Sequence, residues 1–147
     1  MLTYEDIVSN NLFRELLNFN ELHSLGEVHV LFRGSSLPRD GSVIVPSTTF
    51  YSHKTLSTQE SNTPELPDLV VIVHESYQTI KDMHESARFY LEDGSKMVWL
   101  VFPKQRLINT YSSDEHDILT ETDTLTGGDL LPGFTLPVAD VFRDPLE

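Results

Sequence analysis

The pattern of hydrophobic positions predicts a strand, a helix and a second strand in the middle of the chain. Residues 69–73 (LVVIV) and 97–102 (MVWLVF) are uninterrupted apolar runs with the length of strands that are covered on both faces. Between them, from about residue 78 to residue 93, apolar side chains fall on one stripe at helical spacing, and Gly94 stands where a left-handed C-cap belongs. Such a crossover unit normally joins parallel strands, so we expect a parallel strand pair at the centre of the fold.

The first part of the chain predicts a helix followed by two strands. Thr3 and Asp6 form a capping pair, and apolar residues recur at roughly helical spacing over residues 4–18. Residues 27–32 (EVHVLF) and 42–46 (SVIVP) are strand candidates, separated by a loop rich in Gly, Pro and Asp. These elements precede the central unit and indicate an α/β fold with a mixed sheet.

Turn-forming and polar residues organise the remainder. Residues 52–67 are polar and contain two prolines, which predicts a long surface loop. Residues 106–112 and 116–121 form a predicted hairpin around Ser-Asp-Glu at 113–115. The tail is expected to pack back onto the core through five apolar side chains, namely Phe134, Leu136, Val138, Val141 and Phe142.

Composition and charge narrow the class of protein. The 147 residues suit one domain spanning residues 1–147, and the absence of cysteine excludes disulfides and thiolate metal sites. No apolar run approaches the roughly 18–20 residues that span a bilayer, so we expect a cytoplasmic protein with no membrane contact. The formal net charge is −13, which disfavours non-specific DNA binding because phosphate contacts depend on Lys and Arg.

An ordered set of turn and packing residues resembles a known family. It consists of Pro67, Asp68, Tyr90, Gly94, Trp99, Pro103, the LPGF segment at 131–134 and Phe142. Over roughly residues 22–142 this layout resembles the Uma-two family of restriction endonucleases, a branch of the PD-(D/E)xK nuclease superfamily. The resemblance implies a restriction-endonuclease-like core: a mixed sheet with an N-terminal helix and one crossover helix. Family members usually carry a further N-terminal hairpin, which implies that this chain is shortened at its start.

The resemblance also implies a reaction and the residues that carry it. Carboxylates would hold Mg²⁺, which polarises the phosphoryl oxygen and lowers the pKa of the attacking water, while a lysine stabilises the developing charge. At the places that the resemblance assigns to the two acids and the lysine, this chain has Ser42, Ile72 and Ser86. Because these side chains cannot replace the carboxylates, the inherited Mg²⁺ site is expected to be lost.

Displaced side chains could rebuild such a site. Asp40 precedes the first acid position, Asp68 shares the strand face of the second, and Glu75 follows the carboxyl end of that strand beside His74. Lys81 could supply the missing lysine from the helix. Each also has a structural interpretation: Asp40 and Asp68 suit turns, and Lys81 suits an ion pair with the acid four residues later.

Two functions from different classes therefore remain open. Residue chemistry favours a catalytically inactive remnant that binds a partner protein or forms a homodimer, with no cofactor and no catalytic or metal-binding residue. The alternative is a Mg²⁺-dependent DNA phosphodiesterase that uses Asp40, Asp68, Glu75 and Lys81. Convergence of the three acids on one point would favour the enzyme.

Overall fold

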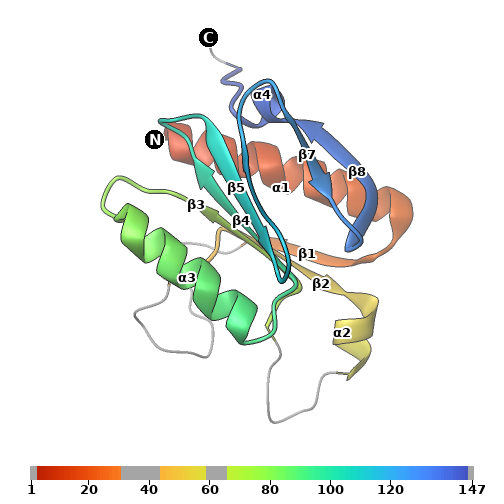
Figure 1. Ribbon diagram of the computed structural model, residues 1–147. Coiled ribbons are helices and arrows are strands. Elements are labelled where there is room, and N and C mark those ends of the chain that lie inside the picture. Colours follow the sequence, from red (N-terminus) through yellow and green to blue (C-terminus); the bar gives the residue numbers. More distant parts are fainter. Residues whose placement is uncertain (1–2, 31–43, 59–65, 146–147) are drawn as a thin grey trace.

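A computed structural model describes residues 3–30, 44–58 and 66–145 of the chain. Figure 1 shows a sheet with one long helix on each face and a small hairpin beside it. The helices are α1 (Tyr4–His23), α2 (His53–Thr58), α3 (Ile80–Glu92) and α4 (Val138–Val141). The strands are β1 (Gly26–Val30), β2 (Thr48–Ser52), β3 (Leu69–Val73), β4 (Met97–Phe102), β5 (Leu107–Ser112), β6 (His116–Leu119), β7 (Thr124–Gly127) and β8 (Leu131–Pro137).

The main sheet is mixed, and its strand order follows the chain from β1 to β6. β3 and β4 are parallel, with Leu69 paired to Met97 and Val73 to Val101. The other four pairings are antiparallel, and β1 and β6 form the two edges. The α/β class and the parallel central pair joined by a crossover helix are therefore confirmed.

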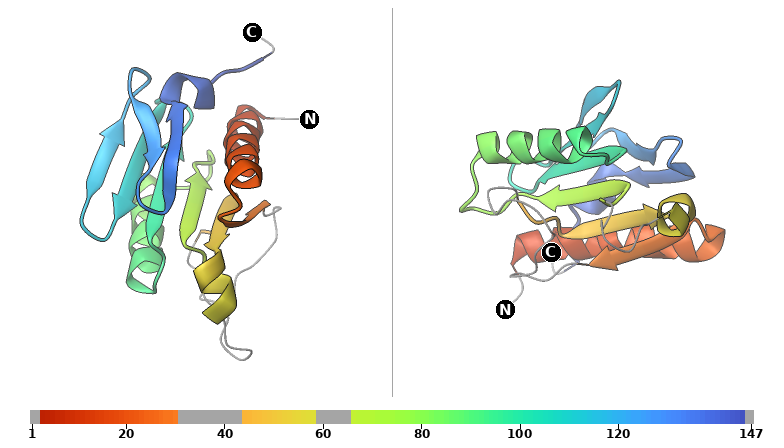
Figure 2. Two further views of the ribbon diagram at one scale, coloured as in Figure 1. Left: turned by 90° about the vertical axis from the view of Figure 1, so that its right-hand side faces the viewer. Right: turned by 90° about the horizontal axis from the view of Figure 1, so that it is seen from below.

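Each face of the sheet carries its own hydrophobic core. Side chains alternate between the faces along a strand, so neighbouring residues of β3 contribute to different cores. Figure 2 shows α3 and α1 on opposite sides of the sheet. The α3-side core consists of Val70, Ile72, Met83, Ala87, Tyr90, Val98, Leu100 and Phe102. The α1-side core is larger and includes Leu12, Leu16, Val71, Trp99, Ile108, Phe134 and Phe142.

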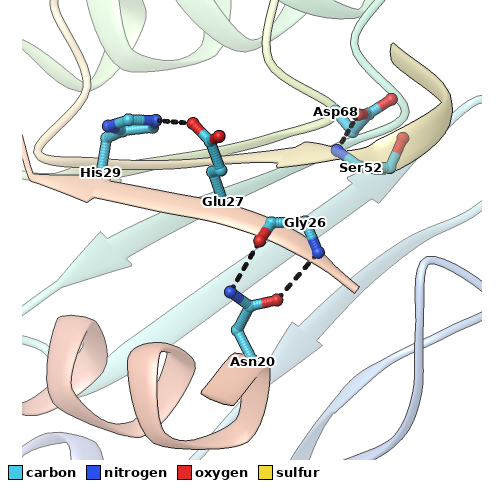
Figure 3. A network of polar contacts seen from close by, with 6 residues as sticks. All are labelled: Asn20, Gly26, Glu27, His29, Ser52 and Asp68. Atoms are coloured by element: carbon cyan, nitrogen blue, oxygen red, sulfur yellow. Dashed lines mark hydrogen bonds and ion pairs between the residues drawn. The ribbon is translucent and has the colours of Figure 1, made fainter. Parts of the chain in front are cut away.

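The capping pair predicted for the first helix is present. The Thr3 hydroxyl accepts from the Asp6 N–H, and the Thr3 N–H donates to the Asp6 carboxylate. The helix continues to His23, five residues beyond the predicted end at residue 18. Asn20 then orders the chain reversal, because its side chain accepts from the Gly26 N–H and donates to the Gly26 carbonyl (Figure 3). Sequence spacing missed this last turn because its exposed residues break the apolar stripe.

Two predictions between β1 and β3 were wrong. The strand predicted at residues 42–46 is absent from its described part, residues 44–46, while residues 42 and 43 lie outside the described residues. Of the loop predicted at residues 52–67, residue 52 ends β2 and residues 53–58 form α2, while residues 59–65 lie outside the described residues. Pattern reading passed over β2 because it contains two threonines, although both are buried there.

The C-terminal third follows the prediction with one difference. The hairpin of β5 and β6 is confirmed, and the five apolar residues predicted for the tail are buried in the α1-side core. The LPGF segment, predicted as a turn, is instead the start of β8, where the pairing with β7 is bulged and Gly133 has a positive φ of 87°. In the described part of the chain, none of the helices has the length and apolar character needed to cross a membrane.

Candidate functional site

Ile72, at the place assigned to a metal-binding acid, lies in the middle of β3 and faces α3. Its side chain is 1% exposed. It belongs to the α3-side core, with Met83, Ala87 and Tyr90 contributed by the helix and Leu100 paired to it on β4. An ionised carboxylate would be costly in this apolar environment unless a cation or several donors accompanied it.

Ser86, at the place assigned to the lysine, is buried on the sheet-facing side of α3. Its hydroxyl accepts from the Ile44 N–H at 3.0 Å. One turn later, the Tyr90 hydroxyl donates to the Ile44 carbonyl at 2.8 Å. These two side chains satisfy both backbone groups of Ile44 and hold this non-strand segment against the α3-side core, where Ile44 also packs.

Among the displaced candidates that the structure describes, Asp68 is the most buried, with 4% exposure. Its carboxylate accepts from the Ser52 N–H at 2.7 Å, as Figure 3 shows, and from the Thr55 hydroxyl at 2.9 Å. Burial raises the pKa of Tyr51, and the Asp68 carboxylate raises it further. Asp68 thus ties the start of β3 to the end of β2 and to α2. These partners lie 16 and 13 residues away in the chain, so the bonds are tertiary contacts and differ from the local turn bonds that an acid after proline commonly makes.

Glu75 lies beyond the other end of β3. The five residues of β3 separate it from Asp68, and a strand rise of about 3.3 Å per residue makes this separation roughly 17 Å or more. The Glu75 N–H donates to the Gln78 side-chain oxygen at 2.9 Å in the turn that leads into α3. One ion therefore cannot be shared by Asp68 and Glu75.

The remaining candidates do not add a metal centre. Lys81 forms the ion pair with Glu85 that its spacing predicts, at 3.8 Å, and both side chains are exposed. Asp40 and Ser42 lie outside the described residues. Among residues 3–30, 44–58 and 66–145, no group of three or more His, Asp or Glu side chains could hold a metal ion.

A group of aromatic and imidazole rings at one side of α3 was missed from the sequence. The Tyr111 hydroxyl lies 2.7 Å from Nδ1 of His84, and the ring of Tyr111 stacks on His116 at a centroid distance of 4.1 Å. Burial lowers the pKa of His84, and the charge of His116 lowers it further, while burial raises the pKa of Tyr111. The predicted hairpin already places Tyr111 opposite His116. The contact with His84 could not be predicted, because it depends on how α3 packs on the sheet.

Comparison with known proteins first defines the class. A crystal structure of "a putative nuclease belonging to DUF820" from Anabaena variabilis is similar, with a TM-score of 0.76, 13% sequence identity, and coverage of 97% of this chain and 82% of that chain. At this identity the likeness shows a nuclease fold. A family model, Uma2, with the description "Putative restriction endonuclease", matches residues 4–139, and the chain therefore belongs to the Uma2 family. No curated protein matches the chain.

Proposed function

We propose that this member of the Uma2 family has kept the nuclease fold, has lost phosphodiester cleavage, and acts as a binding module for a partner protein or a second copy of itself. The observation that carries the proposal is the environment of Ile72. It is packed at 1% exposure among the hydrophobic side chains of the α3-side core. A position that holds a metal ligand needs an oxygen atom and room for the ion with its waters.

The contacts of Ser86 support the same conclusion. A catalytic lysine would carry a charged amine at this position, whereas the Ser86 hydroxyl is buried and accepts the Ile44 N–H. A longer side chain would displace Ile44, whose carbonyl is also held by Tyr90. The two positions thus contribute packing and backbone hydrogen bonds, which stabilise the fold and supply neither a metal ligand nor a cation.

The alternative enzyme would need its acids in one place. Asp68 and Glu75 lie beyond opposite ends of β3, and Lys81 is engaged with Glu85 at the exposed side of α3. Charge adds to this argument, since a protein with a formal net charge of −13 repels a polyanionic substrate unless it gathers its basic residues.

A plasmid-nicking assay tests the loss of cleavage. Supercoiled plasmid would be incubated with the protein in Mg²⁺ and separately in Mn²⁺, with the conservative variants Asp68→Asn and Glu75→Gln run beside it. The expected result is that none of the three proteins nicks DNA above the buffer control. Metal-dependent nicking by the wild type that either variant abolishes would establish the displaced-acid enzyme instead. Equal nicking by all three proteins that stays with the protein through a further chromatography step would also overturn the loss of cleavage, whereas activity that separates from the protein is a contaminant.

A further inference from the structure

The backbone groups of β6 alternate along the strand between two directions, toward β5 and toward the outer edge of the sheet. The Ser112 N–H donates to the Glu115 carbonyl at 2.8 Å, so these two residues form a hydrogen-bonded pair at the hairpin turn. Bonded and non-bonded pairs alternate along an antiparallel ladder, and the register then directs the backbone groups of Asp117 and Leu119 toward β5. Those of His116 and Ile118 point outward, where no strand in the described part of the chain pairs with them.

The side chains along this edge offer an apolar and aromatic surface. Ile118 is 59% exposed, and His116 lies beside it on the α3 side of the sheet, two residues away. The His116 ring stacks on Tyr111 with an interplanar angle of 7°. Because the Tyr111 hydroxyl is bonded to His84 of α3, the stacked pair is held against the body of the protein. An added strand would therefore contact side chains that are already held in place, which lowers the entropy cost of binding.

The charges around the edge select the kind of strand that fits. Asp114 and Glu115 form the turn before β6 and Asp117 lies in the strand, and all three are exposed. Glu121, which follows the strand, is paired with Arg106 at 3.3 Å. In a two-fold pairing with a second copy, a register centred on Asp117 sets this acid against its own copy, and a register centred on Ile118 sets Asp117 opposite Leu119, so neither gives Asp117 an opposite charge. A segment that carries Lys or Arg would instead gain opposite-charge pairs.

We propose that the outer edge of β6 binds an extended basic segment of a partner protein by strand addition. In an antiparallel arrangement, the partner places an apolar residue opposite Ile118, then Lys or Arg opposite Asp117, then Arg or an aromatic residue opposite His116, where a planar group can stack. This inference rests on the binding half of the proposed function and names the partner class. It is independent of the loss of cleavage, which the nicking assay tests separately.

Amide NMR with a defined probe tests the proposal. The probe is the capped peptide Thr-Thr-Val-Lys-Arg-Thr-Thr, and the control is the same peptide with Glu-Glu in place of Lys-Arg. The basic peptide is expected to shift the amide signals of His116 and Ile118 and to slow their hydrogen exchange, while the acidic peptide leaves both unchanged. Asp117→Lys should weaken the basic peptide about tenfold, since an attractive cross-strand pair becomes repulsive. Asp129→Lys, which makes the same change of charge in the exposed turn between β7 and β8, should not.

Three outcomes would overturn the proposal. The first is a peptide titration that moves no β6 amide, or that moves amides only elsewhere. The second is equal affinity of the Asp117→Lys and Asp129→Lys variants for the basic peptide, which would reduce binding to the net charge. The third is protection of the His116 and Ile118 amides by increasing protein concentration alone, together with a doubled mass in solution, which would assign the edge to a second copy.

Discussion

At the scale of single residues, Ile72 is the position where the fold is compatible with a nuclease but the side chain cannot bind a metal ion. A strand of a nuclease fold can accept Ile or Glu at this point, because both side chains extend from the same strand face. What differs is the environment: the α3-side core surrounds Ile72 with aliphatic and aromatic groups from β4 and α3. The sequence shows only that this position holds Ile, whereas the packed structure shows that the side chain is part of a hydrophobic core.

Restoring the acid should therefore cost stability. We expect Ile72→Glu to lower the free energy of unfolding by about 3–5 kcal/mol, since it buries a charge without a partner or forces the carboxyl to take up a proton. Ile72→Val, which removes one methylene from the same site, should cost only about 0.5–1.5 kcal/mol. Urea denaturation followed by circular dichroism measures both. A loss below about 1 kcal/mol for Ile72→Glu would mean that water or a cation reaches the position, contrary to the packing described.

At the scale of elements, the success of sequence reasoning followed the strength of the apolar signal. The bounds of β3 and β4 were predicted without error because strands covered on both faces are uninterrupted apolar runs. β2 was missed because Thr48 and Thr49 are polar by type yet buried in place. The segment at residues 44–46 looked like a strand, but Ser86 and Tyr90 hold its backbone in place of a ladder. Contacts between residues far apart in the chain decided that case, and no local pattern carries them.

The packing of α3 on β5 should depend on pH through His84. Burial and the charge of His116 keep the pKa of His84 below its usual value of 6.5 in the folded protein. Between the folded pKa and 6.5, the unfolded chain binds more protons than the folded one, so stability rises with pH in that window. The free energy of unfolding should thus be fully present above about pH 6.5 and decline as the pH falls through the folded pKa of His84.

Two measurements check the assignment to His84. The imidazole signal of His84, followed by NMR, should titrate with a midpoint below 6.5. His84→Gln removes the titrating group, and it should reduce the slope of unfolding free energy against pH in the acid range. A midpoint at or above 6.5, or an unchanged slope in the variant, would refute the coupling of this helix to pH.

At the scale of the whole molecule, the fold is that of a nuclease, whereas the charge of the molecule does not favour binding to DNA. The mixed sheet with a helix on each face places the chain among nuclease folds, and the match over residues 4–139 places it in the Uma2 family. The positions that the family resemblance assigns to an acid and to the lysine hold the buried residues Ile72 and Ser86, and the formal net charge is −13. We therefore attribute the retained fold to packing and binding, with the exposed edge of β6 as the surface for a basic partner.

The central claim is that no divalent metal binds between β3 and α3, and paramagnetic NMR with Mn²⁺ tests it most directly. The folded, isotope-labelled protein is titrated with Mn²⁺, which should broaden amide signals only diffusely near exposed acids. The Ile72 and Ser86 amide signals should show no saturable loss and no recovery on addition of excess Mg²⁺. Saturable broadening centred on Ile72 and Ser86, relieved by competing Mg²⁺, would show that the inherited metal site survives and would contradict the account.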